Sequence, residues 1–507
     1  MNKEMKIGFN TFDSRVRAQC PEDLEVIQQS GGLDYLVIHI SQEKTPLAGQ
    51  IAQAQALADE MARLDIPFIA NFEGQNFAYD LLTEDGYDWA NHPDGTHRLE
   101  IPAGLIAALN SHGGLLGVMY DEFEHTIINR NVSIALASKF KLSPPVFPLT
   151  HTDNVRIAGE NLSMQIGEYV KEVKDKGAPA FYGEHVFPVL YHTFARNGIV
   201  PNFKSQKECY SNVQFSIAAG AALEYGTPLY SCVDLWFMNT YPGHSPNEMY
   251  YNLIFNYLVG TDGVYVEHCN AFSQVGAIND YGKNFIRFAQ EYRGKERAYN
   301  VQDYKPEIGI IRYDDGFWGQ GTTPLIWPNE LLGNPKIKPK KENKEWIKIF
   351  RLITHGQTGR GGLAWDRVEP RSFLTKHRSF VPMNGAAVFD DRVDAEKLTS
   401  LKLCFLCGTY ISQKTLDGVK KLVHENGLTV VTPLRFAPDA MRKTVTGGYR
   451  EFRDGNGAWI ITDDFESAKL KARIAPFLGD ENEMKFTFGD ETVRMRIAED
   501  GESFTVI

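Results

Sequence analysis

The sequence predicts an α/β protein that begins with a (β/α)8 barrel, the TIM barrel fold, and continues with a small doubly wound α/β unit and a C-terminal antiparallel β unit. Three observations predict this order. Short apolar runs alternate with helical segments eight times within roughly the first 270 residues, the usual size of such a barrel. Several of these runs end in acidic residues. The alternation then gives way to a second βα rhythm, and finally to segments in which apolar and polar residues alternate one by one.

The barrel strands are expected where apolar runs are uninterrupted, because a parallel strand in a barrel is covered on both faces. The fourth strand (LLGVMY) is the clearest example, and Pro21 followed by two acids marks the start of the first helix. The expected strands are residues 6–10, 34–40, 66–72, 115–120, 179–182, 199–203, 228–233 and 263–266. The expected helices between them include residues 49–64, 102–111, 207–225 and 247–259.

Beyond the barrel, a second alternation of strands and helices predicts a doubly wound unit. Its expected strands are residues 306–312, 402–406 and 428–432, and its expected helices are residues 346–354 and 414–425. The later segments GAWIITDD, EMKFTFGDE, VRMRIAED and SFTVI alternate in the manner of antiparallel strands. The predicted domains are therefore residues 1–304, 305–440 and 441–507.

Composition and charge exclude some classes of partner. The 507 residues carry a formal net charge of −11 and show no Lys/Arg patch that would neutralise a phosphate backbone, so no nucleic-acid partner is expected. No run approaches the ~18–20 apolar residues of a membrane span. The N-terminal residues enter the first strand without a signal-peptide pattern. This fits a cytoplasmic protein, or a secreted or periplasmic protein whose signal peptide has been removed.

The sequence contains no motif for a metal or a cofactor. Cys404 and Cys407 form a CxxC inside an expected strand, without the second Cys pair or the His that zinc sites contain. The segments GGLDYL and GQGTTP lack the Lys and the strand–loop–helix context of a phosphate-binding loop. We therefore expect a function that uses no cofactor.

Acidic residues at the ends of four expected barrel strands are the main functional signal. The segment GVMYDEFEH ends the fourth strand, and GEH, DLW and EH end the fifth, seventh and eighth. Active sites of (β/α)8 barrels are built at the carboxyl ends of their strands, and burying unpaired charge is expensive. The pattern predicts carboxylate chemistry at one face of the barrel. The acids concerned are Asp121, Glu122, Glu184, Asp234 and Glu267.

The order of the parts carries a resemblance. A barrel, an α/β domain containing the pattern LTSLKLCFLCGTYISQKTLDGVKKLVHENGLTVVT within residues 391–432, and a short β domain resemble the family-42 β-galactosidases and related clan-A glycoside hydrolases. The resemblance implies a glycosidase acting on a carbohydrate substrate. It also implies a non-catalytic flavodoxin-like or amidotransferase-like middle domain that helps trimerisation, and hence a homo-oligomer, a dimer or a trimer. Clan-A enzymes place Asn-Glu after strand four and a nucleophilic Glu after strand seven, where this chain has Asp121-Glu122 and Asp234.

Glycoside hydrolysis requires one carboxyl group that donates a proton and a second that is ionised. The resemblance places the general acid at Glu122, while Asp121 could take that role or orient Glu122. Glu267, Glu184 and Asp234 remain alternatives for the second carboxylate, with a slight preference for Glu267 and none between the other two. Glu124, close behind the pair, is expected to be structural or to bind substrate. His185 and His268 adjoin Glu184 and Glu267 and could hold them by hydrogen bonds.

Polar and aromatic residues at or just after the strand ends are expected to contact the substrate as a set. They are His39, Asn71, Glu73, Tyr120, Tyr182, His185, Trp236, His268 and Asn270. The loop YDDGFWGQG, with Asp314, Asp315 and Trp318, is expected either to fold back over the barrel mouth or to form an ordinary turn.

Two other functions remain open. The first is a metal-dependent barrel hydrolase, although there is no HxH after the first strand. Its candidate ligands are His39, Asp121, Glu184, His185, Glu267 and His268. The second is a non-catalytic carbohydrate-binding barrel, which would keep the aromatic residues and tolerate the loss of Glu122.

Overall fold

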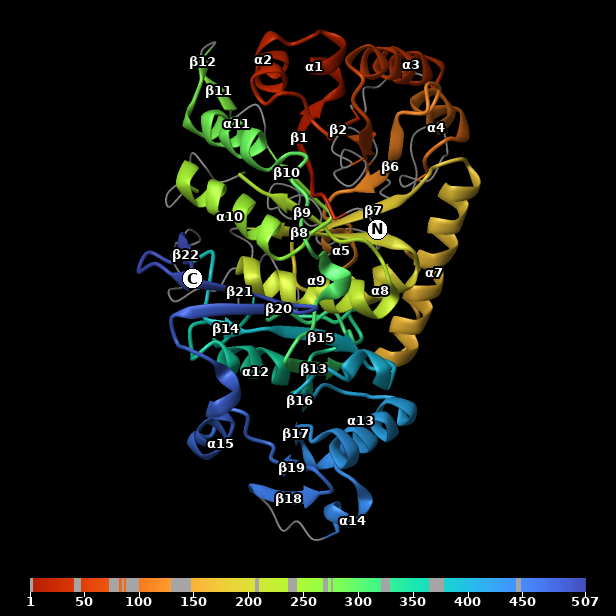
Figure 1. Ribbon diagram of the computed structural model, residues 1–507. Coiled ribbons are helices and arrows are strands. Elements are labelled where there is room, and N and C mark those ends of the chain that lie inside the picture. The colour runs from red at the N-terminus through yellow and green to blue at the C-terminus, as the bar shows by residue number, and fades with distance from the viewer. Residues whose placement is uncertain are drawn as a thin grey trace.

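The computed structural model describes residues 3–40, 47–72, 82–83, 86–87, 100–128, 147–205, 209–235, 244–267, 272–274, 277–320, 329–363, 378–443 and 448–507. Within these residues, eight parallel strands close into a barrel in the order β1-β10-β9-β8-β7-β6-β3-β2 (Figure 1). The predicted TIM barrel is confirmed. The strands are β1 (Lys6–Phe12), β2 (Tyr35–His39), β3 (Phe68–Asn71), β6 (Leu115–Tyr120), β7 (Phe181–His185), β8 (Ile199–Ser205), β9 (Tyr230–Val233) and β10 (Gly263–Val266).

Helices surround the barrel, as expected of this fold. They are α1 (Asp13–Arg17), α2 (Pro21–Gln29), α3 (Leu47–Leu64), α4 (Ala103–Leu109), α5 (Phe123–Ile128), α7 (Val155–Asp175), α8 (Tyr191–Arg196), α9 (Ser211–Tyr225), α10 (Pro246–Leu258) and α11 (Asp280–Tyr292). Helix α7 was not predicted. Two short hairpins, β4 (Leu82–Thr83) with β5 (Gly86–Tyr87) and β11 (Ser273–Gln274) with β12 (Ala277–Ile278), also belong to this part of the chain.

Inward-facing side chains fill the barrel in two layers, because alternate residues of each strand point to the interior. The lower layer is an apolar cluster of Tyr35, Val37, Ile69, Met119, Tyr182, Tyr230, Cys232 and Tyr265. Two residues further along most of these strands, the inward side chains become polar. They include His39, Asn71, Asp121, Glu184, Asp234 and Glu267. The apolar layer thus closes the barrel below and leaves its carboxyl end as a polar mouth.

A second sheet follows the barrel, in the order β15-β13-β16-β17-β19-β18. Its strands and main helices are β13 (Ile308–Arg312), α12 (Glu345–Ile353), β15 (Ala386–Asp390), β16 (Leu403–Leu406), α13 (Gln413–Asn426), β17 (Thr429–Thr432), α14 (Asp439–Arg442), β18 (Arg450–Asp454) and β19 (Gly457–Ile461). The five parallel strands have the order 2-1-3-4-5, the order of flavodoxin-like sheets, and β18 pairs antiparallel at the edge. The predicted doubly wound unit is confirmed.

One strand assignment from the sequence is wrong. The segment GAWIITDD was expected in the C-terminal antiparallel unit, but β19 pairs in parallel with β17 and belongs to the second sheet. The small antiparallel sheet contains β14 (Met383–Asn384), β20 (Glu483–Phe488), β21 (Glu491–Ile497) and β22 (Phe504–Val506), with β14 joined in parallel to β20. Helix α15 (Ala468–Leu478) lies between the two sheets in the sequence.

Helix α9 joins the barrel to the second sheet. Every residue from Ser211 to Leu223 is buried, as expected of a helix covered on all sides. Figure 1 shows α9 between the barrel strands and β15. At Gly220 a Cβ atom would lie 1.7 Å from the carbonyl oxygen of Val388, so only a glycine allows the helix and strand backbones to approach this closely.

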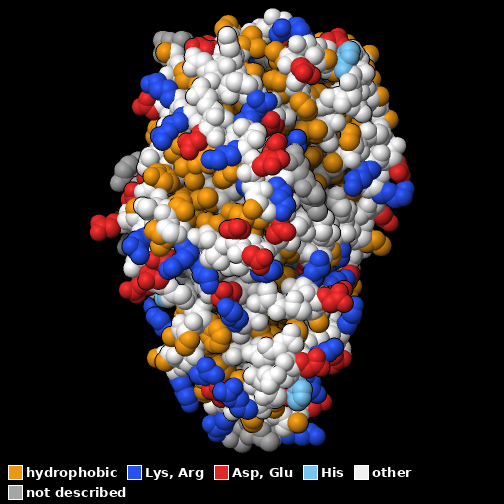
Figure 2. Space-filling model, in the orientation of Figure 1, with side chains coloured by type: hydrophobic (Ala, Val, Ile, Leu, Met, Phe, Trp, Pro, Cys, Tyr) orange, Lys and Arg blue, Asp and Glu red, His pale blue; other side chains and the backbone are white. Residues whose placement is uncertain are grey.

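Two features of the described residues bear on possible partners. None of the described helices is both long and apolar enough to cross a bilayer. On the face shown in Figure 2, Lys and Arg side chains are interspersed with Asp and Glu side chains.

Candidate active site

The centre of the polar mouth is the ammonium group of Lys204, which lies near the end of β8. Its Nζ atom is within 3.9 Å of all five acids that the sequence singled out. The distances are 3.0 Å to Glu184 Oε1, 3.1 Å to Asp234 Oδ2, 3.1 Å to Glu267 Oε2, 3.2 Å to Glu122 Oε1 and 3.9 Å to Asp121 Oδ1. Strand ends that are far apart in the sequence therefore place five carboxylates around one cation.

Burial would lower the pKa of Lys204, but the surrounding carboxylates outweigh burial and hold the pKa well above its usual value. The group is therefore a permanent cation at neutral pH. The side chain is only 3% exposed, so its charge acts in a region from which water is largely excluded.

Glu122 is held in an unusual conformation at the rim of the mouth. Its φ angle is 49°, in the left-handed region that costs a residue with a side chain about 1–3 kcal/mol. Its Oε2 atom lies 2.8 Å from Nδ1 of His125, and its Oε1 atom contacts Lys204. At 19% exposure, its side chain is the most accessible of the five acids.

The pKa of Glu122 is about 2. Burial alone would raise this pKa, but Lys204 and His125 more than offset burial by stabilising the ionised form. An acid with this pKa is ionised throughout the neutral range. The value argues against the proton-donor role that was expected of Glu122 from the sequence.

Glu184 has the opposite environment, although it contacts the same ammonium. Burial, followed by the repulsion of Asp121, Glu267 and Asp234, raises its pKa well above the usual value, and Lys204 only partly offsets this rise. The hydroxyl of Tyr265 contacts its Oε2 atom. Glu122 and Glu184 thus favour opposite protonation states, which is the arrangement that acid/base catalysis uses.

Of the residues expected to contact substrate, His39 and Asn71 lie in the polar mouth. Nε2 of His39 is 2.7 Å from Nδ2 of Asn10, and Nδ2 of Asn71 lies 3.4 Å from Oδ2 of Asp121. Side-chain amides therefore flank the carboxylates on the β1–β3 side of the barrel.

Tyr120 lies outside the mouth, which corrects the sequence expectation. It faces helix α7, where its ring stacks on Phe181 at 6.2 Å and contacts the edge of Tyr169. Its position follows from strand alternation, because Asp121 next to it points inward. Tyr182 does face the interior, but it belongs to the apolar layer beneath the acids, where it packs against Tyr230.

His185 also lies away from the acids. Its ring stacks on Tyr191 at 3.8 Å, and its Nδ1 atom is 3.1 Å from the carbonyl oxygen of Val189. Burial lowers its pKa to about 3, so it is neutral. Its nearest carboxylate is Glu124, at 3.8 Å, so the expected hydrogen bond to Glu184 is not formed.

Glu124 is structural, one of the two roles expected for it. Its Oε1 atom accepts a hydrogen bond of 2.7 Å from the backbone N–H of Phe187. The remaining four candidates lie outside the described residues. They are Glu73, Trp236, His268 and Asn270.

The loop after β13 reaches the barrel through Trp318. Its ring stacks on Phe187 at 4.4 Å, and Phe187 in turn meets the ring of His125, the partner of Glu122. Asp315 turns away from the mouth and bonds Arg312 at 2.8 Å. Trp318 is almost fully buried, so it supports the rim rather than offering a surface to a substrate.

The sequence did not single out Lys204 or His125. The expected sixth strand ended at residue 203, one residue before Lys204. In the structure β8 continues to Ser205, and its alternation carries Asn202 and Lys204 to the interior. Because alternate residues of a strand point to the same side, Lys204, two residues after Asn202, would have been placed in the mouth if the expected strand had been extended by one residue.

Two groups in the mouth have the composition of metal-ligating sets. His39, Asp121 and Glu267 each place a ligand atom within 4.8 Å of the other two, and so do Glu184, Cys232 and Glu267. The sulfur of Cys232 lies beneath Glu267, at 3.4 Å from Oε2. Burial raises the pKa of that thiol well above its usual value.

Comparisons with known proteins give structural likeness only. No protein-family model matches the sequence, and no curated protein matches it. Among solved structures, the chain is similar to a GH5_18 protein from Streptomyces cattleya in complex with Manb1-4GlcNAc. The identity is 12%, the match covers 61% of this chain and 84% of that chain, and the TM-score is 0.39.

Two further structures give similar values. A GH5_18 protein from Bifidobacterium longum is 11% identical, with coverages of 62% and 83% and a TM-score of 0.40. The catalytic domain of a GH26 endo-beta-1,4-mannanase from Bacillus sp. JAMB-750 is 12% identical, with coverages of 56% and 85% and a TM-score of 0.37. These neighbours are clan-A glycoside hydrolases. Their likeness is too low to bear on what this chain does, and the family-42 resemblance is not confirmed.

Proposed function

We propose that this protein is a glycoside hydrolase that cleaves the glycosidic bond of a carbohydrate with retention of configuration. The observation that carries the proposal is the group of carboxylates around Lys204 at the carboxyl end of the barrel, the face on which such barrels build active sites. Within that group, Glu122 and Glu184 have pKa values shifted in opposite directions. A glycosidase requires this difference between its two carboxyl groups.

Retention is supported by the distances to Lys204. Four of the five carboxylates place an oxygen within 3.2 Å of Nζ, so the nearest oxygens of any two cannot be further apart than twice that distance. Retaining enzymes separate their carboxyl groups by ~5–5.5 Å, whereas inverting enzymes need ~6.5–9.5 Å to admit a water. Carboxylates gathered on one ammonium favour the shorter separation of a retaining enzyme, and the anomer that is released first decides the question.

The protonation states suggest the roles. Glu122 is ionised and is the most accessible of the acids, so we assign it as the nucleophile that forms the glycosyl-enzyme. The raised pKa of Glu184 favours its protonated form, so we assign it as the acid that gives its proton to the leaving oxygen and then takes one from water. Lys204 keeps Glu122 ionised and is a positioning residue in this scheme.

The experiment measures hydrolysis of a panel of aryl α- and β-glycosides with leaving groups of different basicity. The variants are Glu122→Gln and Glu184→Gln, and NMR identifies the anomer formed first. Glu122→Gln should lower kcat/KM by a factor of ~10² or more on every substrate. Glu184→Gln should have a low kcat/KM with basic leaving groups and a kcat/KM close to wild type with dinitrophenyl glycosides, whose leaving group departs without a proton.

The matched control is Glu172→Gln on α7. This carboxylate is 55% exposed and pairs with Lys176 at the end of the same helix, so the variant should behave as wild type. Release of the opposite anomer would disprove retention. A wild-type protein that binds an oligosaccharide but hydrolyses no glycoside would establish the carbohydrate-binding alternative. The oligomer implied by the family-42 resemblance stays a prediction, which light scattering of the purified protein tests.

A further inference from the structure

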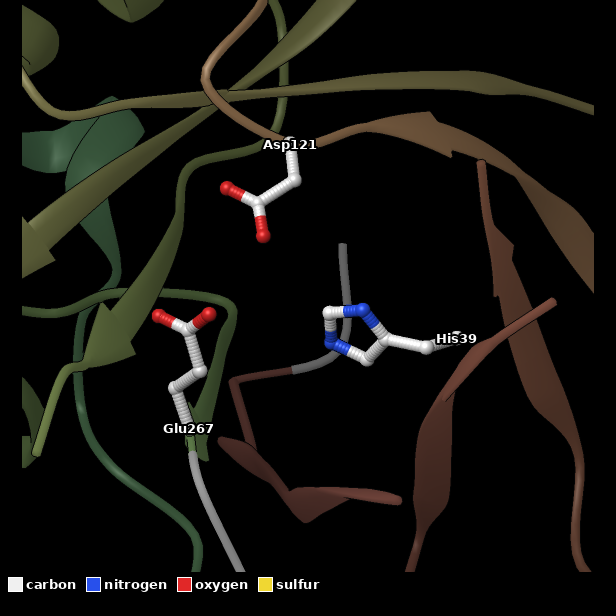
Figure 3. Close-up of side chains that lie close together, drawn as sticks. All are labelled: His39, Asp121 and Glu267. Atoms are coloured by element: carbon white, nitrogen blue, oxygen red, sulfur yellow. The ribbon is translucent and has the colours of Figure 1, made fainter. Parts of the chain in front are cut away.

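The mouth also contains a group of possible metal ligands, which the proposed glycoside hydrolysis does not require. His39, Asp121 and Glu267 end the second, fourth and eighth strands of the barrel, and one ligand atom of each lies within 4.8 Å of the other two. All three side chains are buried and point toward one another (Figure 3). We propose that these three residues form a binding site for a divalent transition-metal cation.

The donor set suits such an ion. One imidazole and two carboxylates are common ligands of Zn²⁺ and Mn²⁺. Three protein ligands leave at least one coordination position for water or for a substrate hydroxyl, as in catalytic rather than structural metal sites. A neighbouring amide is placed to orient one ligand, because Nδ2 of Asn71 donates to Oδ2 of Asp121 at 3.4 Å.

Contact with the ammonium does not prevent the two carboxylates from binding a metal. Lys204 approaches Oδ1 of Asp121 at 3.9 Å and Oε2 of Glu267 at 3.1 Å. A carboxylate has two oxygens and about four lone-pair positions, so it can accept from an ammonium and bind a metal at once.

The test is a calorimetric titration of the full-length, chelator-treated protein with MnCl2 and, separately, with ZnCl2. Wild type should bind one ion per chain. His39→Gln, which removes the imidazole, should weaken binding by ~10²-fold or more, whereas Asp234→Asn, which removes a nearby charge but no ligand, should weaken it distinctly less. Asp234 is the matched control, because it shares the burial of the set and its contact with Lys204 but lies outside the three ligands.

The proposal is overturned if wild type shows no saturable binding, or if the two variants weaken binding equally. A crystal soaked in MnCl2 gives an answer that does not depend on variants. An anomalous peak among His39, Asp121 and Glu267 supports the site, and a peak only elsewhere refutes it. Because neither measurement reads glycoside hydrolysis, loss of this proposal and loss of the proposed function are distinguishable.

Discussion

At the scale of single residues, the feature that organises the mouth is the imbalance between one ammonium and several carboxylates. Lys204 lowers the pKa of Glu122 and also opposes the rise in the pKa of Glu184. Removing one partner of a buried ion pair is far more damaging than the pair is stabilising, because the remaining charge is left uncompensated. Lys204 therefore bears on both the stability and the protonation pattern of the site.

We predict that Lys204→Met lowers the melting temperature most at neutral pH and that the deficit shrinks toward pH 5. Without the ammonium, the pKa values of the buried carboxylates in the folded state rise above their unfolded values. The folded state then binds more protons than the unfolded state, so its stability increases as the pH falls. Lys204→Met removes one partner of a buried ion pair. Substitutions of this kind typically lower the free energy of unfolding by about 3–5 kcal/mol at neutral pH.

Thermal unfolding followed by circular dichroism between pH 5 and 8 measures this effect. Lys171→Met, on the exposed face of α7, is the control and should match wild type at every pH. A deficit of the same size at all pH values would show that Lys204 contributes packing rather than charge.

The sequence located the five acids because a carboxylate after an apolar strand is conspicuous on its own. It could not locate Lys204, since a lysine near the expected end of a weakly defined strand resembles a solvated residue. The left-handed backbone conformation of Glu122 could not be predicted from the sequence either, because tertiary packing imposes it and no glycine at that position indicates it.

At the scale of elements, the sequence predicted the positions of strands better than it predicted which strands pair with each other. The fourth and eighth barrel strands begin and end at the expected residues. Strand β19 was recognised as a strand but assigned to the wrong sheet, since local alternation says nothing about which distant strand will pair with it. Hydrogen bonding with β17 decides the matter, and it depends on the packing of the whole second sheet.

The C-terminal end of α9 and the end of β15 form a second buried charged group. Oε2 of Glu224 accepts a hydrogen bond of 2.9 Å from the backbone N–H of Asp390, whose own carboxylate bonds Arg196 at 2.6 Å. Burial and then the charge of Asp390 raise the pKa of Glu224 to about 8. This element junction is therefore sensitive to alkaline pH.

We predict that Glu224→Gln stabilises the protein at pH 9 and changes little at pH 5. The folded-state pKa of about 8 lies above the ordinary value of a glutamic acid, 4.5, so the proton on Glu224 contributes stability that is fully present below the lower value. That contribution is lost as the pH rises through about 8. Glutamine keeps an acceptor for the Asp390 N–H and cannot ionise, so we expect a melting temperature at pH 9 that is higher by about 2–4 °C.

Calorimetry at the two pH values, with Glu172→Gln as the exposed control, measures this difference. Equal melting temperatures of wild type and Glu224→Gln at pH 9 would contradict the prediction. They would mean that water reaches Glu224 and that its ionisation does not destabilise the folded protein.

At the scale of the whole molecule, the barrel and the second sheet share a core. The polar side chain of Asn212 in α9 donates to the carbonyl oxygen of Val381 at 2.7 Å and accepts from its N–H at 3.2 Å. The backbone N–H of Ser211 donates to the carbonyl oxygen of Ser379. A helix buried along almost its whole length, and fixed on its far side by hydrogen bonds, belongs to both units.

We predict that the fragment of residues 1–304, the barrel domain proposed from the sequence, does not fold on its own. Cutting there would expose the face of α9 that packs on β15 and would leave buried polar groups, among them Asn212, without their partners, which costs about 1–3 kcal/mol for each group. The full chain should unfold in one cooperative calorimetric transition. The fragment should be insoluble, or should bind a hydrophobic dye and melt without a sharp transition.

Gly220→Ala tests the same contact in the full chain, because the added Cβ would overlap the Val388 carbonyl. The helix and the strand would have to separate, so the variant should lower the melting temperature of the single transition without splitting it. A monomeric fragment with a sharp transition, together with a full chain indifferent to Gly220→Ala, would show that the barrel is an independent domain and that α9 belongs to it alone.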